Sequence, residues 1–294
     1  MMKDRIRYVI EGLIAGTAFG TASIIIRLLE NVNVYTIASM RLIIAFLALI
    51  VICFFAKGTL FRLRLFDPHL VAMGLLIGLH FLFFISAVKN TTIVNATVLV
   101  NTAPVLTLLL GILVFDVRVS IRDVLCVFIA FLGAFIITYP DLRVAGNLWG
   151  DIEAIIAALF EGLYLNIGFK VRRKMDAMLM MIPIYLFATI VVSLSAYLTG
   201  NPLYFPLEIR TITLLIAIGL IPTAIGHTLY VSSLRGLKSF ETAMMALLEP
   251  LSASIIAFFL FSEVPDLWSI TGSIIVMFAV VLVSTKKENT VESM

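Results

Sequence analysis

Long apolar runs, separated by short polar breaks that often contain glycine or proline, occupy almost the whole chain. The runs lie near residues 8–29, 34–56, 67–88, 92–114, 120–139, 148–170, 178–199, 209–232, 240–260 and 266–285. An α-helix needs about 20 apolar residues to cross a hydrocarbon layer about 30 Å thick, and each run is close to that length. The pattern therefore predicts an all-α integral membrane protein with ten transmembrane helices.

Composition supports lipid as the solvent of this chain. Apolar residues make up 62% of it and charged residues only 13%, whereas about 25% of the residues of soluble domains are charged. The first run, residues 8–29, is too long for the apolar core of a signal peptide, so we interpret it as a retained span. Cys53 and Cys126 lie inside apolar runs without the spacing of metal ligands, and neither a metal site nor a cofactor is predicted.

The basic residues indicate an orientation. Most of the 21 Lys and Arg residues fall in segments on the same side as the N-terminus. Because cytoplasmic segments are enriched in Lys and Arg, both termini are predicted to be cytoplasmic, with an even number of spans in the cytoplasmic membrane. The net charge of +3 then reflects topology, so the expected partner is the lipid bilayer and not a nucleic acid.

The two halves of the chain resemble each other at an offset of 146 residues. Ser86-Ala87-Val88-Lys89 aligns with Ser232-Ser233-Leu234-Arg235, and Pro104 aligns with Pro250. We therefore divide the chain into repeats over residues 8–140 and 147–285, each with five predicted spans. An odd number of spans inverts the second repeat, and inverted repeats supply the two related conformations of an alternating-access transporter.

Short motifs recur at matching places in the two halves. The second run opens with Ser39-Met40-Arg41-Leu42-Ile43-Ile44-Ala45, the fourth contains Thr102-Ala103-Pro104, the ninth contains Leu248-Glu249-Pro250 and ends in Phe261-Ser262-Glu263, and the last contains Gly272. In order and spacing these motifs resemble the paired EamA repeats of the drug/metabolite transporter superfamily. The first half departs from the pattern, because Asp116 lies 12 residues after Pro104 whereas Glu263 lies 13 residues after Pro250.

The resemblance implies a ten-helix fold around a central cavity lined by the first, third, fourth, sixth, eighth and ninth spans. It also implies export of metabolites or drugs, with bacterial amino acid exporters as the best-understood relatives. The superfamily's substrates include amino acids, sugars, nucleotide sugars, polyamines and cations, so the resemblance does not choose among them.

Carboxyl groups inside apolar runs are the first candidates for chemistry, since an ionisable group in a span costs at least about 2.5–3.5 kcal/mol. Glu249 precedes Pro250, whose missing N–H leaves the carbonyl near Ala246 without its helical donor. Such a pair of oxygens can bind a cation, an ammonium group or a proton. The alternative interpretation is a protonated Glu249 that only bonds to a neighbouring helix.

The sixth run has one polar and aromatic face. At 100° per residue the members of this face are Glu153, Ala157, Phe160, Glu161, Tyr164 and Gly168. Carboxyls beside aromatic rings suit a cationic or aromatic amine, so Glu161 and Tyr164 become cavity candidates. Ordinary packing of small and aromatic residues is the alternative, with Glu153 near the outer surface.

Two histidines occupy nearly equivalent positions in the two halves, His80 in the third run and His227 in the eighth. Histidine titrates near neutrality and can relay a proton, although a buried imidazole bonded to a backbone carbonyl is the commoner arrangement. The eighth run also carries Pro222, Gly226 and Tyr230 along one stripe. Pro222 and Gly226 are candidates for a bend or gate, as are the repeat residues Pro104 and Pro250, and Tyr230 is a cavity candidate.

The remaining candidates come from the fourth and first runs. Thr97 and Asn101 share one helix edge with Pro104 and are expected to line the cavity, with interhelical bonding of the amide as the alternative. Thr17 and Thr21 flank a ridge of glycines spaced four residues apart, which predicts close helix packing, and both threonines are candidates to face the pore. Arg41 is expected to snorkel to the outer interface or to pair with an acid.

Together these features favour a secondary transporter that moves a small metabolite, with export of an amino acid or related amine by alternating access as the best hypothesis. The chain has no G-x-x-x-x-G-K-[ST] loop, so a gradient must supply the work. Proton coupling through Glu249 or Glu161 and facilitated diffusion both remain open. A membrane-embedded enzyme is disfavoured because His69, His80 and His227 are scattered and no H-E-x-x-H or G-x-S-x-G occurs. A non-transporting scaffold is the other alternative.

Overall fold

The computed structural model describes residues 2–55, 64–91, 93–139, 147–261 and 267–285, and the regular elements within these ranges are all helical. In chain order they are α1 Met2–Leu28, α2 Val34–Phe55, α3 Pro68–Asn90, α4 Ile93–Val100, α5 Ala103–Leu113, α6 Ile121–Thr138, α7 Leu148–Arg172, α8 Ala177–Leu198, α9 Ile209–Ile218, the π-helix η3 Gly219–His227, α10 Thr228–Ser233, α11 Ser239–Ala246, α12 Leu248–Phe261 and α13 Leu267–Ser284. Ser262 and Glu263 of the sequence motif, and residue 140 at the end of the first repeat, lie outside the described residues.

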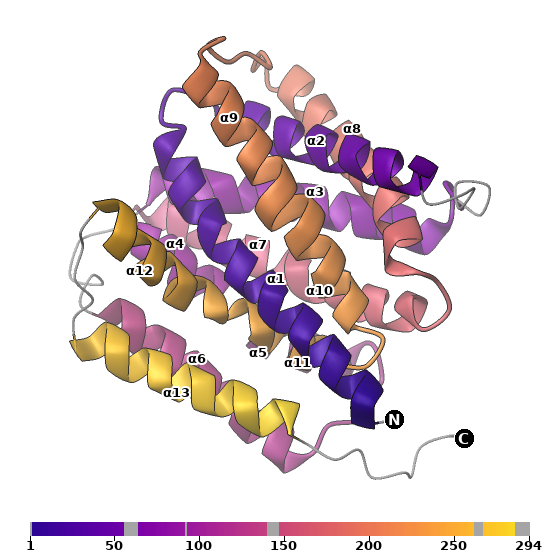
Figure 1. The fold of residues 1–294 in the computed structure, drawn as a ribbon, viewed down its shortest axis with the longest axis vertical. Helices are drawn as coiled ribbons and strands as arrows, with labels where there is room; N and C mark the ends of the chain where they lie inside the picture. Colours follow the sequence, from indigo (N-terminus) through magenta and orange to yellow (C-terminus); the bar gives the residue numbers. More distant parts are fainter. Residues whose placement is uncertain (1, 56–63, 92, 140–146, 262–266, 286–294) are drawn as a thin grey trace.

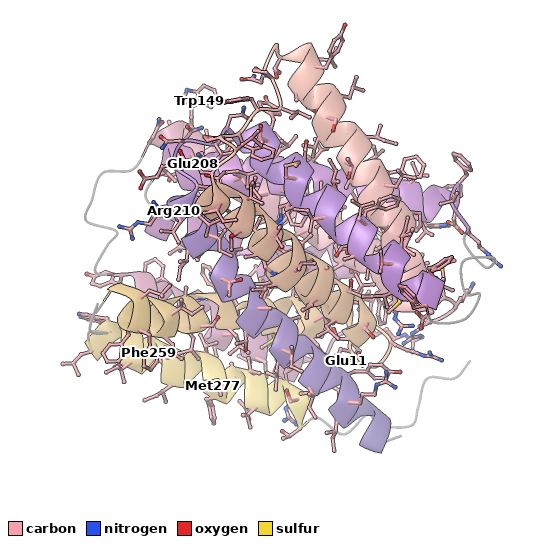
Figure 2. The ribbon with its side chains drawn as sticks, turned by 45° about the horizontal axis from the view of Figure 1, so that its top comes forward. Glu11, Trp149, Glu208, Arg210, Phe259 and Met277 are labelled. Carbon is pink, nitrogen blue, oxygen red and sulfur yellow. The ribbon has the colours of Figure 1, made fainter. Side chains whose placement is uncertain are left out.

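Eight helical stretches among the described residues are long and apolar enough to cross a membrane. Three of them are composite, because α4 with α5, α9 with η3 and α10, and α11 with α12 each form one apolar stretch. Apolar side chains also cover the outside of the bundle, and Figure 2 shows Phe259 and Met277 among them. Because such a surface is stable in hydrocarbon and not in water, the chain is a multi-pass membrane protein.

Several helices begin at residues whose side chains satisfy the first free backbone N–H groups. Asp67 accepts a hydrogen bond from the His69 N–H ahead of Pro68, and Asn147 accepts one from the Trp149 N–H. Ser120 forms a reciprocal capping box with Asp123 at the start of α6. Capping residues of these types are preferred at helix starts, which explains why the apolar runs are interrupted at these points.

The two halves of the chain pack into each other. The third long helix of the first half, α3, packs against α7 and α8, which begin the second half. The corresponding segment of the second half, α9 to α10, packs against α1 and α2. Figure 1 shows α6 and α13 side by side along one edge of the bundle. The two helices pack closely because their backbones approach each other at Gly133, where a Cβ would lie 2.9 Å from the Gly272 carbonyl oxygen.

Two of the long stretches are interrupted at equivalent places. The first breaks between α4 and α5 at Asn101 and Thr102, just before Pro104, and the second breaks between α11 and α12 at Leu247, just before Pro250. Pro222 and Gly226 lie inside the π-helix η3. Pro104 and Pro250 therefore lie just after a break, where a proline removes a regular hydrogen bond, and Pro222 and Gly226 lie where the helix is widened.

The glycine ridge of α1 lies against α11 and α12. A Cβ built on Gly16 would collide with the Met245 carbonyl oxygen, and one built on Gly20 would collide with the Ser252 hydroxyl. The next residue along, Thr17, is exposed on the outside of the bundle and its hydroxyl donates to the Leu13 carbonyl oxygen. The glycine ridge turns its own face toward α11 and α12 and rotates Thr17 away from them, and Thr17 is not among the residues that line the central cavity of this structure.

A leucine in place of Gly16 is expected to lower the free energy of unfolding by roughly 1–3 kcal/mol or more, since its side chain would push α1 away from the α11 backbone. Thermal unfolding of the purified protein in detergent measures this loss. Thr17→Leu is the matched control, because it adds the same side chain one residue along on the exposed face. Equal melting temperatures for the two variants would contradict close packing at the ridge.

Candidate functional site

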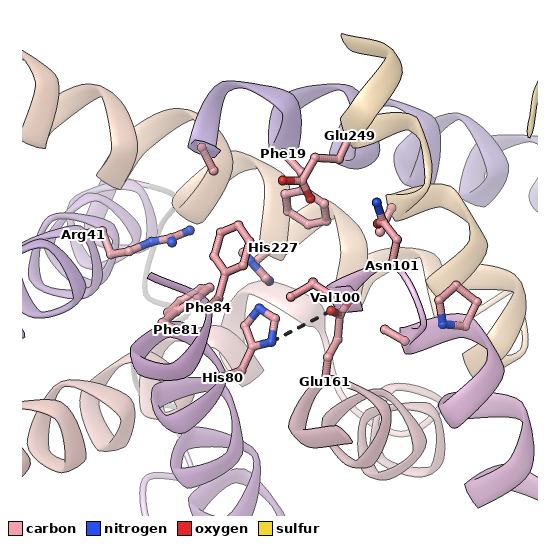
Figure 3. A pocket seen from close by; sticks show the side chains of 14 residues that line it. Phe19, Arg41, His80, Phe81, Phe84, Val100, Asn101, Glu161, His227 and Glu249 are labelled. Carbon is pink, nitrogen blue, oxygen red and sulfur yellow. Dashed lines mark ion pairs between the residues drawn. The ribbon is translucent and has the colours of Figure 1, made fainter. Parts of the chain in front are cut away.

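A central cavity lies where the interrupted helices meet the long ones. Figure 3 shows the side chains around it, which come from α1, α2, α3, α4, the α4–α5 break, α5, α7, η3, α11 and α12: Phe19, Ala22, Arg41, His80, Phe81, Phe84, Val100, Asn101, Ala103, Pro104, Glu161, His227, Ala246 and Glu249. All six spans implied by the resemblance contribute to this lining. The second span contributes as well, through Arg41.

Glu161 is buried and held in place by two partners. Its Oε1 atom accepts a 2.8 Å hydrogen bond from the Tyr230 hydroxyl, and its Oε2 atom lies 3.9 Å from Nδ1 of His80. His80 Nδ1 also lies 2.9 Å from the Ala157 carbonyl oxygen, which can only accept, so Nδ1 carries the proton. Tyr230 itself lies behind the lining and orients the carboxyl, which projects into the cavity (Figure 3).

Glu249 is the second buried carboxyl of the cavity. It lies in the first turn of α12, directly before Pro250, and is only 7% exposed. Its Oε1 atom has no hydrogen-bond partner among the described residues. A buried polar atom without a partner is costly, so this oxygen is a place where water, a proton or a solute would be stabilised.

Aromatic rings form the wall between these polar groups. The Phe19 ring lies 4.6 Å and the Phe81 ring 4.9 Å from the His227 ring, measured between centroids, and Phe84 stacks on His80 at 6.0 Å. Nδ1 of His227 is buried without a hydrogen-bond partner in the described part of the chain. The cavity therefore combines apolar aromatic surface with a few polar groups, which is the usual composition of a small-molecule site.

Arg41 does not reach the outer interface. Its side chain is only 1% exposed, its Nε donates a 2.9 Å hydrogen bond to the Thr223 hydroxyl, and its guanidinium carbon lies 3.8 Å from the centre of the Phe81 ring. No acidic residue of the described chain pairs with it. The expectation of snorkelling or acid pairing is wrong, because Arg41 lies about 10 Å along α2 on the face that is turned into the bundle.

The other predicted site residues divide between the cavity and its surroundings. Asn101 lines the cavity, and its Nδ2 atom is buried without a partner among the described residues. Thr97 is buried but does not line the cavity. The Tyr164 hydroxyl points to the Met181 sulfur of α8 at 3.5 Å, and the Thr21 hydroxyl donates to the Ala18 carbonyl oxygen within α1. Neither residue lines the cavity in this structure.

The described residues contain no group of three His, Cys, Asp or Glu side chains placed to hold a metal ion. The polar groups of the cavity are a guanidinium, two carboxyls, an amide and two imidazoles, set among phenyl rings. Such groups bind charged and polar solutes without forming covalent bonds to them.

Comparison with known proteins assigns this arrangement to a family. The model of the EamA-like transporter family matches residues 6–139 and again residues 148–285. Two relatives from Archaeoglobus fulgidus, each called an uncharacterized transporter, are 26% identical over 74% of this chain and 76% of the relative, and 24% identical over 92% and 93%.

A solved structure, titled only as the crystal structure of a protein, superposes with a TM-score of 0.80 at 14% identity. It covers 95% of this chain and 97% of the other, and at this identity it shows a shared fold alone. The family model covers both halves of the chain, and the relatives of similar length are named as transporters. The chain belongs to the EamA-like transporter family and is a membrane transporter of a small molecule.

Proposed function

We propose that this transporter exports an amino acid or a related amine across the cytoplasmic membrane by alternating access, with both termini in the cytoplasm. The observation that carries the substrate proposal is the buried cavity whose lining combines two carboxyls, Glu161 and Glu249, with phenyl rings. Ammonium groups bind to carboxylates and to the faces of aromatic rings, especially where water is excluded. Membership of a transporter family also argues against an enzymatic role.

The proposal includes ten spans arranged as two inverted five-helix repeats. The eight long stretches would be completed by α6 and α13, the pair at the edge of the bundle. Two observations support an internal repeat. The helix breaks at Asn101 and Leu247 are 146 residues apart, the same offset that relates Pro104 to Pro250. The contacts of α3 with α7 and α8 mirror those of α9 to α10 with α1 and α2.

Asn166 joins three helices on one side of the cavity. Its Nδ2 donates to the Thr107 carbonyl oxygen of α5 at 3.0 Å, and its Oδ1 accepts a 2.7 Å hydrogen bond from the Ser239 hydroxyl at the start of α11. α11 packs directly against α5 and α7 around this bridge. The bridge would have to break for the cavity to open on the side where α11 begins.

A second connection closes the same side. Arg5 Nη2 lies 2.9 Å from Glu241 Oε1, and Glu241 is only 1% exposed. Arg5 also donates to the carbonyl oxygens of Gly236 and Val283, both at 3.1 Å. Figure 1 shows the start of α1 and the end of α13 near this edge of the bundle. The ion pair therefore joins α1 to α11, and the hydrogen bond to Val283 joins α1 to the end of α13.

Counterflow in proteoliposomes tests the proposed function. Purified protein is reconstituted and loaded with a pool of unlabelled amino acids, amines and sugars, and the uptake of each labelled solute is followed. We expect saturable exchange of amino-group-bearing solutes and none of sugars, because the buried carboxyls favour an ammonium group. Protein-free liposomes are the control. No exchange of any solute by well-folded protein would contradict transport of the proposed class.

A further inference from the structure

The guanidinium of Arg41 is held in one orientation from two sides. Its Nε is bonded to the Thr223 hydroxyl, and one face of the group lies on the Phe81 ring. Its Nη1 atom is buried and has no hydrogen-bond partner among the described residues. This N–H donor of a fixed cation is thus free at the wall of the cavity.

The π-helix supplies the partner that fixes Arg41. The Thr223 hydroxyl donates to the carbonyl oxygen of Ile218, five residues earlier, at 2.7 Å, which leaves its lone pairs to accept from Arg41. The Tyr185 hydroxyl of α8 donates to the Thr223 carbonyl oxygen at 2.6 Å and holds this turn from the other side. π-helical segments are rare in proteins but frequent at functional sites.

The cavity also separates its charges. Glu161 and Glu249 line it together with Arg41, and neither carboxyl forms an ion pair with the guanidinium. Glu161 is occupied by Tyr230, whereas Glu249 keeps a free oxygen. A buried guanidinium without an ion-pair partner is costly. It is stabilised when a solute brings an anionic group to Arg41, and the carboxyls can then accept hydrogen bonds from a cationic group of the same solute.

We propose that Arg41 binds a carboxylate of the transported solute, so that the site takes an α-amino-acid zwitterion in preference to an amine without a carboxylate. Arginine is suited to this role because its guanidinium stays charged when buried and donates charge-assisted hydrogen bonds to carboxylates. The Nδ2 atom of Asn101 is a second free donor at the same cavity. The inference rests on the proposed function, since it names the substrate class of that same cavity.

Competition among matched solutes tests the inference. Counterflow by the full-length protein is measured for the twenty common amino acids, for their decarboxylated amines, and for the corresponding carboxylic acids without the amino group. We expect wild-type exchange of one or more amino acids and at least about tenfold weaker competition by both analogue series, because each analogue leaves one buried charge unpaired. In Arg41→Gln the preference for an amino acid over its decarboxylated amine should fall by at least about tenfold.

Two further variants separate a binding role from a structural one. Thr223→Val removes the hydroxyl that positions Arg41 and should weaken the preference for the carboxylate by a smaller factor than Arg41→Gln. Arg172→Gln is the matched control, because Arg172 is also buried but bonds to the Met175 carbonyl oxygen and the Ser232 hydroxyl outside the cavity. Elution as a single species in gel filtration confirms folding of each variant.

The outcomes of these assays distinguish failure of the role of Arg41 from failure of the proposed transport function. Exchange of amines as good as that of amino acids, or an unchanged preference in Arg41→Gln, would overturn the role of Arg41 and leave the transporter in place. Exchange confined to solutes without an amino group would overturn both the zwitterion and the proposed substrate class. If folded wild-type protein exchanges nothing, the proposed function fails as well.

Discussion

A Glu249→Gln variant is expected to lose about 10- to 100-fold of the exchange rate of the wild-type protein while folding normally. Hydrogen bonds to charged groups contribute about 1.5–3 kcal/mol, and glutamine keeps the shape of the side chain but removes its charge. The free Oε1 atom of Glu249 is the carboxylate oxygen of the cavity best placed to accept a hydrogen bond from an ammonium group. Initial rates of counterflow measure the loss.

Glu208→Gln is the matched control for this substitution. Glu208 is exposed, lies before α9 and makes no capping hydrogen bond with its side chain, so its loss should leave exchange unchanged. Figure 2 shows it on the outer surface of the bundle.

Repeating the assay with an imposed pH gradient separates proton-coupled transport from facilitated diffusion. A gradient that accelerates the wild type but not Glu249→Gln would assign proton coupling to Glu249, and wild-type rates in Glu249→Gln would exclude its carboxylate from the transport step.

The positions of the helices follow from local features of the sequence. The apolar runs coincide with the long helical stretches because each run is bounded by residues that satisfy free backbone groups, such as Asp67 and Asn147. The breaks before Pro104 and Pro250 follow from the missing proline N–H. These features act within one turn of the chain, so they can be recognised without knowing which helices are neighbours.

The partners of the buried polar groups could not be predicted in this way. Arg41 and Thr223 are 182 residues apart and lie in different halves of the chain, and Tyr230 and Glu161 are 69 residues apart within the second half, so both contacts depend on how distant helices pack. The sequence does hold one signal for Arg41, its place well inside an apolar run, and the interpretation as a snorkelling residue gave that depth too little weight. Depth within a span is the better indicator of burial for a long basic side chain.

The assignment of faces has the same limit. Periodicity places Thr17 about 100° from Gly16 but does not say which face of the helix meets the bundle. The structure shows that the glycine face meets α11 and α12, which leaves Thr17 exposed. For α7 the same reasoning identified Glu161, which lies at the cavity, and Glu153, which instead accepts hydrogen bonds from Ser86 and Asn90 of α3.

Two ion pairs near the start of α1 are expected to differ greatly in their contribution to stability. The pair between Arg5 and Glu241 is buried and joins two helices, whereas the pair between Arg7 and Glu11 lies within α1, with Arg7 72% and Glu11 12% exposed, so its cation is solvated. Removing one partner of a buried pair costs about 3–5 kcal/mol because the other charge stays buried. An exposed pair contributes only about 0–1 kcal/mol.

Glu241→Gln is therefore expected to lower the free energy of unfolding by several kcal/mol more than Glu11→Gln, as measured by thermal unfolding at matched detergent concentration.

The Glu241→Gln substitution should also open the cavity on the side where α1 begins, since Arg5 would lose its ion pair with α11. A cysteine introduced at Ala103, in a chain with Cys53 and Cys126 replaced by serine, reports this through labelling by a membrane-impermeant thiol reagent applied from each side in turn. Labelling that rises from the terminal side only in Glu241→Gln would identify the ion pair as part of the gate. Equal stability and equal labelling of the two variants would reduce it to a surface contact, in spite of the 1% exposure of Glu241.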